Sequence, residues 1–404
     1  MNIHLHSVSA LAFTGLFGLG AGGGSTPPSE DPYSGLFKFS LADDVSAKIG
    51  GRLFYDWGWF DGDEATFNTD ATGTTPELED GTEFRAGRIH VEGELYQQVG
   101  FKAEFDFSQA GATEFKDVFM TLKDTAVGEL KVGHFKEPFS LEQLTSARFI
   151  TFMERGLTET FTPGRNSGFQ ILDQNEEKSM TWAAGVFRTT DNFAKNTGDG
   201  EYGYTARVTG TPLMAEDGAE FVHLGAAASF RTDGSVRFRS RPEAHLLNQP
   251  ADSGTLVADE TLLTGLEAAW VGGPLSVQSE YQMAAVSGGS GGPDADFSAY
   301  YFLVSYFLTG EHRNYKNTTG AFDRIKPSEN FGTGSGAVEL AARYSFLDLD
   351  DGPSTDEMTD ATIGVNWYLN PNTRVMLDLV HSEFEDGTVD DDANLLLMRF
   401  QVDW

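Results

Sequence analysis

The amino-acid sequence predicts an all-β protein, a sixteen-stranded antiparallel transmembrane β-barrel. Three observations lead to this prediction. Apolar and polar residues alternate with a period of two in segment after segment, as they do in strands with one apolar and one polar face. Apolar runs stay shorter than the roughly 18 residues that a membrane-spanning helix needs. Long acidic connections alternate with short ones between the predicted strands.

The polar face of the predicted strands carries charged residues. Leu53, Tyr55 and Trp57, for example, alternate with Arg52 and Asp56. A soluble β-sandwich also alternates, but charges on one face and large aromatic residues near the strand ends on the other are typical of a water-filled lumen and a lipid-facing band. The sixteen predicted strands begin near residues 47, 83, 101, 115, 129, 167, 178, 202, 219, 261, 275, 297, 336, 361, 373 and 393.

The last predicted strand shows the alternation most clearly. Its polar positions are Arg399, Gln401 and Asp403, and its final residue is aromatic. Its apolar positions are Leu396, Met398, Phe400, Val402 and Trp404. Bacterial outer-membrane barrels commonly close with such a strand.

The connections differ between the two ends of the predicted barrel. Connections from even to odd strands are short, except for a long segment over 309–335. Connections from odd to even strands are mostly long, and three of them, within 61–82, 348–360 and 383–392, hold 19 of the 61 acidic residues. We interpret these acids as solvating groups. Divalent-cation binding at the outer surface is the alternative.

Composition excludes several classes of protein. A formal charge of −33 over 404 residues argues against nucleic-acid binding, which needs Lys and Arg to neutralise phosphates. The absence of cysteine excludes disulfides and thiolate chemistry. An apolar, Gly-rich N-terminus predicts a signal peptide over 1–24, then a short periplasmic segment over 25–45 and a barrel domain over 46–404. No basic residue precedes the apolar stretch, so a disordered N-terminus or a misassigned start codon is the alternative.

The sequence does not predict an enzyme. The five residues 288–292 match G-x-S-x-G, but no predicted strand-turn-helix surrounds them. The eight histidines show no metal-ligand spacing, and no H-E-x-x-H or P-loop motif is present. We therefore expect no cofactor and no metal.

Several segments together carry a more specific signal. They are Val132–Glu142, Arg237–Glu243, Tyr306–Glu311, Glu339–Ser345, Asn366–Asn372 and Arg399–Asp403. In this order, from about residue 46 to the end of the chain, they resemble the phosphate-selective porin O/P family. The sequence departs from the family pattern at Val338, where the family often has Trp, and at Trp404, where it usually has Phe.

The resemblance implies a trimer of barrels in the bacterial outer membrane, in contact with outer-membrane lipid and lipopolysaccharide. In such porins the third extracellular loop folds inward and narrows the pore, and here that loop would span about 136–166. The resemblance also implies a ladder of arginines that leads inorganic phosphate or other small anions to a basic constriction.

The best ladder candidates are Arg237, Arg239 and Arg241. Their spacing places three guanidinium groups on one face of an extended segment. Arginine matches phosphate or carboxylate bidentately and stays charged at any working pH. A solvated basic patch neutralised by nearby acids is the alternative.

Four further arginines are candidates for the constriction. Arg88 lies on the lumen side of its strand by parity, whereas Arg85 does not unless a bulge redirects it, and Arg148 and Arg155 belong to the third loop. The alternative role is an ion pair that holds the loop to the wall. The partners would be Glu142, Glu154 or Glu159.

Parity places many other charges in the lumen, where we expect salt-bridge networks. The bases are Arg52, Lys102, Lys131, Arg207, Arg343 and Arg399, and the acids are Asp56, Glu92, Glu94, Glu104, Asp106, Glu267, Glu280, Glu339, Asp378 and Asp403. Selectivity depends on the field at the narrowest ring rather than on the total charge.

The sequence therefore predicts an outer-membrane porin for diffusion of small anions, with phosphate or polyphosphate favoured. A general or cation-leaning porin is one alternative. A structural or adhesion barrel with a plugged lumen is another.

Overall fold

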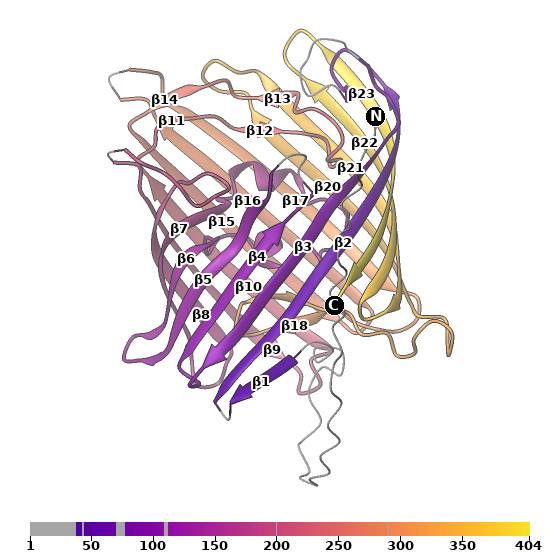
Figure 1. Cartoon of the computed structure of the whole chain (residues 1–404). Helices are drawn as coiled ribbons and strands as arrows, with labels where there is room; N and C mark the ends of the chain where they lie inside the picture. Colours follow the sequence, from indigo (N-terminus) through magenta and orange to yellow (C-terminus); the bar gives the residue numbers. More distant parts are fainter. Residues whose placement is uncertain (1–37, 43, 70–76, 109–111, 199, 290) are drawn as a thin grey trace, which may run out of the picture. The chain divides into compact units, whose positions relative to one another are not determined.

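Sixteen consecutive antiparallel strands close into a barrel in the computed structural model (Figure 1). Each strand pairs with the next along the chain, and the last pairs back on the first from Arg52↔Asp403 to Gly62↔Ala393. The barrel strands are β2 (Val45–Gly62), β3 (Gly81–Leu95), β4 (Val99–Asp106), β5 (Glu114–Thr125), β6 (Gly128–Lys136), β7 (Arg165–Gln174), β8 (Met180–Arg188), β9 (Gly203–Met214), β10 (Glu220–Arg231), β15 (Glu260–Gly272), β16 (Leu275–Ser287), β17 (Ala295–Phe307), β20 (Ala337–Leu349), β21 (Asp356–Asn370), β22 (Thr373–Glu385) and β23 (Asp390–Asp403).

The remaining elements are short and belong to the N-terminal side of β2 or to connections. They are β1 (Lys38–Ala42), which pairs with β2, α1 (Leu141–Leu144), the 3-10 helix η1 (Leu157–Phe161), β11 (Gly234–Val236), β12 (Arg239–Ser240), β13 (Ala251–Asp252), β14 (Leu256–Ala258), β18 (Asn314–Lys316) and β19 (Ala321–Asp323).

The structure describes residues 38–42, 44–69, 77–108, 112–198, 200–289 and 291–404. The predicted signal peptide over 1–24, and most of the segment predicted over 25–45, lie outside these residues. Within the described part of the chain, no helix has the length and apolar character needed to cross a membrane.

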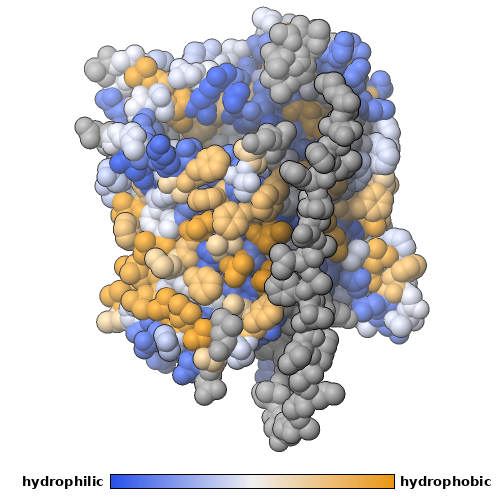
Figure 2. All heavy atoms as spheres, viewed as in Figure 1, coloured by the Kyte–Doolittle hydropathy of each residue, from blue (hydrophilic) through white to orange (hydrophobic). Residues whose placement is uncertain are grey.

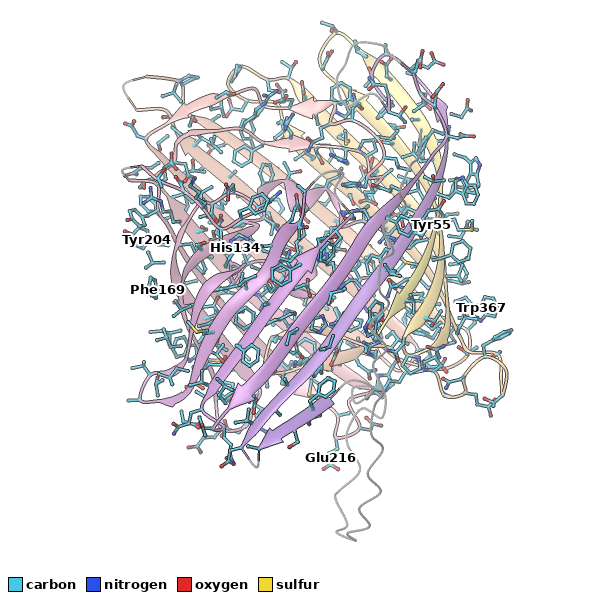
Figure 3. The ribbon with its side chains drawn as sticks, in the orientation of Figure 1. Tyr55, His134, Phe169, Tyr204, Glu216 and Trp367 are labelled. Atoms are coloured by element: carbon cyan, nitrogen blue, oxygen red, sulfur yellow. The ribbon has the colours of Figure 1, made fainter. Side chains whose placement is uncertain are left out.

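The prediction of a sixteen-stranded barrel is confirmed, and every predicted strand begins within five residues of an observed one. The period-two pattern is the physical cause, because a strand turns successive side chains to opposite faces. In β17, buried and exposed residues alternate from Ala295 to Phe307. Figure 2 shows apolar side chains gathered across the middle and lower part of the visible face of the wall. Tyr55, Phe169, Tyr204 and Trp367 lie on the wall strands (Figure 3).

Several connections contribute residues to the interior, and we name three of them L3 (137–164), L5 (232–259) and T6 (308–336). L3 carries α1 and η1, L5 carries β11 to β14, and T6 carries β18 and β19. L3 and L5 leave the long-loop end of the barrel. T6 leaves the short-turn end, where the other connections between described strands are short.

An apolar cluster fills one side of the barrel interior. Phe139, Met153 and Phe161 of L3 and Phe238 and Leu247 of L5 pack in it against wall residues of β15 to β23. Burial of this apolar surface stabilises the inserted loops by about 25 cal/mol per Å². The open space must therefore lie on the other side of the interior, along β2 to β9.

Candidate functional site

A cavity of about 470 Å³ runs along the inner wall of β2 to β9. L3 bounds it from one side, and T6 reaches it with Lys316, Thr318 and Thr319. Its basic lining residues are Arg52, Arg85, Arg88, Lys102, Lys131, Lys136, Arg148, Arg155, Arg165, Arg207, Lys316 and Arg399. Its acidic lining residues are Glu92, Asp117, Glu129, Glu154 and Asp173. Twelve bases against five acids make the lining positive, although the chain as a whole carries −33.

The arginines of the strand wall are paired with carboxylates. Arg88 Nε lies 2.6 Å from Asp106 Oδ2, and Arg52 Nη2 lies 3.0 Å from Glu104 Oε2. Arg165 Nε lies 2.8 Å from Asp117. These pairs fix the guanidinium groups in place, as expected for charges that would otherwise be desolvated alone.

A β-bulge brings Arg85 into the cavity. The register of β2 and β3 passes from Phe54↔Ala86 to Tyr55↔Phe84, which leaves Arg85 as the extra residue. Its guanidinium then makes two hydrogen bonds to Glu154 of L3, at 2.8 and 3.0 Å.

Glu154 lies between two guanidinium groups. Its Oε1 accepts from Arg85 and also from Arg399 Nη2 at 2.9 Å. Burial alone would raise the pKa of Glu154, but the attraction of Arg85 and Arg399 outweighs burial and lowers its pKa below the ordinary value. Glu154 is therefore a carboxylate at working pH and binds L3 to two strands of the wall.

Three lysines of the cavity differ from the arginines because they have no carboxylate partner. Among the described residues, no carboxylate oxygen lies within 4.0 Å of the ammonium groups of Lys131, Lys136 or Lys316. Lys131 Nζ instead lies 4.0 Å from the ring centre of Phe119 and 4.3 Å from that of Phe135. Contact with a carboxylate therefore does not neutralise these three lysines within the described part of the chain.

Lys136 and Arg155 bind the carboxyl end of α1. Lys136 Nζ donates to the carbonyl oxygen of Gln143, and Arg155 donates to the carbonyl oxygens of Glu142 at 3.0 Å and Thr145 at 3.3 Å. Carbonyl partners satisfy the donors without cancelling the charge. Arg155 also lies 3.8 Å from Glu159, which only partly offsets it.

L3 is held to the opposite wall by hydrogen bonds to its backbone. Glu280 accepts from the backbone N–H groups of Leu141 and Glu142, at 3.1 and 2.8 Å, and Asp378 accepts from that of Met153 at 2.8 Å. Additional donors from the wall to L3 carbonyls are Arg343, Asn366, Arg374, Arg399 and Gln401. The loop is thus placed by β16 and β20 to β23.

T6 is held in the barrel by the wall as well. Arg207 donates to the carbonyl oxygens of Thr319 at 3.2 Å and Gly320 at 2.7 Å, and it also pairs with Glu267 at 2.7 Å. His223 Nδ1 lies 2.6 Å from the hydroxyl of Tyr315. These contacts place Lys316 at the cavity.

The predicted site residues divide into two groups. Arg85, Arg88, Arg148 and Arg155 line the cavity, whereas Arg237, Arg239 and Arg241 are not among its lining residues. Arg237 is paired with Asp252, Arg239 is exposed, and Arg241 donates to the carbonyl oxygen of His245.

Sequence reasoning did not single out Lys136, Arg165 or Lys316. Lys136 and Arg165 flank the third loop, at the last residue of β6 and the first of β7. The signal for Lys316 was the unusual length of the connection over 309–335, since a long segment at the short-turn end has room to fold inward. Basic residues at the ends of strands beside an inserted loop are therefore candidates as good as those within the strands.

The described residues contain no group of three or more His, Asp or Glu side chains arranged to hold a metal ion. The acidic connection within 61–82 is one of those with divalent-cation binding as an alternative role. One of its acids, Asp70, lies outside the described residues.

Residues 48–404 match the protein family described as phosphate-selective porin O and P. The chain belongs to this family. Porin O of Pseudomonas aeruginosa is 25% identical to it over 407 residues, which cover 89% of this chain and 88% of Porin O. An uncharacterized protein of Caulobacter vibrioides is 31% identical over 345 residues, which cover 81% of this chain and 66% of that protein, just under two thirds of its length.

Solved structures with the same fold include a porin and a further outer-membrane protein. An anion-selective porin from Comamonas acidovorans has a TM-score of 0.53 at 13% identity, covering 89% of this chain and 100% of that one. The trimer form of OmpT from Vibrio cholerae has a TM-score of 0.54 at 12% identity, covering 90% and 100%. At these identities the likeness shows the fold alone.

The family places the chain in the bacterial outer membrane and makes it a channel rather than an enzyme. In barrels of this kind the long loops face the cell exterior and the short turns face the periplasm. L3 and L5 are therefore extracellular loops, and T6 is a periplasmic connection.

Proposed function

We propose that this porin passes small anions by diffusion along the cavity of β2 to β9, with phosphate or polyphosphate favoured. The observation that carries the proposal is the lining of twelve bases and five acids in a chain of charge −33. The local field at the narrow part of a pore decides which ions pass. A positive lining under acidic loops therefore favours anions.

The solute is bound mainly by the ammonium groups that lack carboxylate partners. Lys136 and Lys131 are five residues apart on β6, or about 17 Å at the rise of a strand. Lys316 approaches from the periplasmic end on T6. These three positions, with Arg155 beside Lys136, replace the water around the anion with N–H donors. Several weak sites in series allow an anion to be bound and then released.

The paired arginines have a different role. Each of Arg85, Arg88 and Arg148 contacts a carboxylate. These arginines therefore shape the wall and contribute to the long-range electrostatic field, but they do not offer an unpaired guanidinium group to the anion. We assign Arg237, Arg239 and Arg241 of L5 to the approach from the cell exterior, because they lie outside the cavity lining.

The descriptions of the family and of similar proteins support this proposal. The family is described as phosphate-selective, one relative is Porin O, and one structure of the same fold is an anion-selective porin. The trimer form of OmpT supports a homotrimer. The location in the outer membrane supports contact with its lipid and lipopolysaccharide. The acidic loops favour a competing function, that of a general or cation-leaning porin. The second alternative is a structural barrel with a plugged lumen, which would not conduct ions.

The test is the reversal potential of the purified porin in a planar bilayer under a KCl gradient, repeated with millimolar phosphate. We expect an anion-selective current that phosphate blocks. A cation-selective current that is indifferent to phosphate would overturn the proposal in favour of a general porin. A folded barrel without any conductance would identify the plugged barrel.

A further inference from the structure

Asp403 lies on the lumen side of β23, one residue before Trp404 and directly opposite Arg52 of β2. Its exposed fraction is 2%. A buried carboxylate at this position needs cationic partners. It finds them in two arginines that come from opposite ends of the barrel.

Arg148 of L3 is the first partner. Its Nη1 lies 3.3 Å from Asp403 Oδ2, and its backbone carbonyl accepts from Gln401 Nε2 at 3.0 Å. Arg148 also lines the cavity. The extracellular loop thus extends down to the periplasmic end of the last strand.

Arg324 of T6 is the second partner. Its Nη1 lies 3.2 Å from Asp403 Oδ1, its Nη2 contacts Oδ2, and it also donates to the carbonyl oxygen of Pro371. The ring of Phe149 is shared by both guanidinium groups, with centroid distances of 4.9 Å for Arg148 and 5.0 Å for Arg324.

One carboxylate therefore holds two guanidinium groups close together. The two like charges repel each other, and the shared carboxylate and ring offset that repulsion. Without the carboxylate charge, Arg148 loses its one acidic partner among the described residues, and the field in the adjacent cavity becomes more positive.

We propose that Asp403 is a positioning residue of the anion path. It determines where the Arg148 guanidinium stands and how much of its charge the cavity experiences, and it ties L3 to T6 through Arg324. This inference rests on the proposed function, since it assigns a role within the same path. It predicts that the field beside Arg148 responds to charge changes at Asp403 and Arg324 in opposite directions.

The absence of cysteine in the natural chain makes a site-specific probe possible. Ala147 lines the cavity next to Arg148, and Ala147→Cys would be the single thiol. Its rate of modification is measured with two methanethiosulfonate reagents of similar size, one anionic and one cationic, in folded porin. The ratio of the anionic to the cationic rate reports the local field and does not depend on transport.

With Asp403→Asn we expect this ratio to rise on the order of fivefold, because an uncompensated guanidinium attracts the anionic reagent. Asp403→Glu should restore the ratio of the parent porin. Arg324→Gln should lower the ratio, because the negative charge of Asp403 is then no longer shared between two arginines and acts on Arg148 only. Glu339→Gln is the matched control: it removes a buried wall carboxylate that contacts Asn366 and Tyr368 instead of Arg148 or Arg324, and should leave the ratio unchanged.

An unchanged ratio in folded Asp403→Asn porin would overturn the inference. If the Asp403→Asn variant does not fold, the Arg324→Gln variant is the test. A ratio that stays constant or rises in Arg324→Gln would overturn the inference. A cation-selective parent channel would defeat the proposed function while the ratios still decide the role of Asp403. An anion-selective, phosphate-blocked parent with unresponsive ratios would defeat this inference only.

Discussion

Phe322 and Thr145 join the two inserts of the barrel: the backbone N–H of Phe322 in T6 donates to Thr145 Oγ1 in L3 over 3.3 Å. The same hydroxyl donates to the carbonyl oxygen of Leu141, the first residue of α1, over 2.8 Å. A periplasmic connection and an extracellular loop therefore meet inside the barrel. The width and charge of the path depend on both, so changes in T6 should alter selectivity as changes in L3 do.

The lysines without carboxylate partners should carry the affinity for phosphate. Lys316→Gln removes one ammonium from the cavity and breaks no hydrogen bond to a described side chain. We expect the phosphate block of KCl current to weaken about tenfold, since a hydrogen bond to a charged group contributes about 1.5–3 kcal/mol. Lys123→Gln is the matched control, because Lys123 pairs with Glu94 at the rim and is absent from the cavity lining. Equal losses in both variants would contradict a specific role for Lys316.

The arginines of L5 should affect the approach of anions more than their binding. Arg237 is exposed and paired with Asp252, and Arg239 is exposed. Charges at an exposed rim mainly change association rates and their salt dependence. We expect Arg239→Ala to slow the onset of phosphate block at low ionic strength and to leave the off-rate unchanged. A faster off-rate, measured from single-channel block times, would instead place Arg239 in the binding path.

Glu159 should make the selectivity depend on pH. Desolvation inside the barrel raises the pKa of Glu159 above its ordinary value, against the opposing effect of Arg155 and Lys136. As pH falls, Glu159 therefore loses its charge earlier than an ordinary glutamate, and Arg155 loses a nearby carboxylate. We expect the anion-to-cation permeability ratio to rise on the order of twofold through the mildly acidic range.

Glu159→Gln should give the higher anion-to-cation permeability ratio already at neutral pH. It should also remove the rise of this ratio in the mildly acidic range. A variant that retains the full pH dependence would show that another group titrates. Reversal potentials measured at constant ionic strength give the profile.

A row of like charges crosses the extracellular ends of four strands. Asp348, Glu357, Glu385 and Asp390 are consecutive partners across β20, β21, β22 and β23. Like charges directly opposite each other destabilise a sheet by about 0.2–1 kcal/mol per pair. Glu385→Lys replaces two repulsive pairs with attractive ones, so it should raise the thermal unfolding temperature of the porin in detergent.

The gain from Glu385→Lys should shrink as salt is added, because Glu385 and its partner Asp390 are exposed to solvent. Glu220→Lys is the matched control, since Glu220 faces Gly272 rather than an acid and the change in total charge is the same. A gain of equal size in the control would attribute the effect to the net charge of −33 instead of to the row.

The strands of the barrel wall can be predicted from the amino-acid sequence alone. A strand has a side-chain period of two, so the alternation of Leu53 and Tyr55 with Arg52 and Asp56 is sufficient to predict a strand and its two faces. The same parity placed Arg88 and Arg399 on the lumen side, and both line the cavity. These properties are local, and each can be predicted from a few neighbouring residues.

The tertiary structure alone decided how the lumen is divided. Packing of L3 and L5 against β15 to β23 leaves the cavity on the side of β2 to β9. This packing depends on one apolar cluster whose members, such as Phe139 and Phe297, lie more than a hundred positions apart in the sequence. One bulge turned Arg85 inward against the parity of its strand. Lys316 reached the cavity through the fold of T6. Loop insertion and bulges depend on long-range packing and hydrogen bonds, and a periodic pattern in one strand carries no information about either.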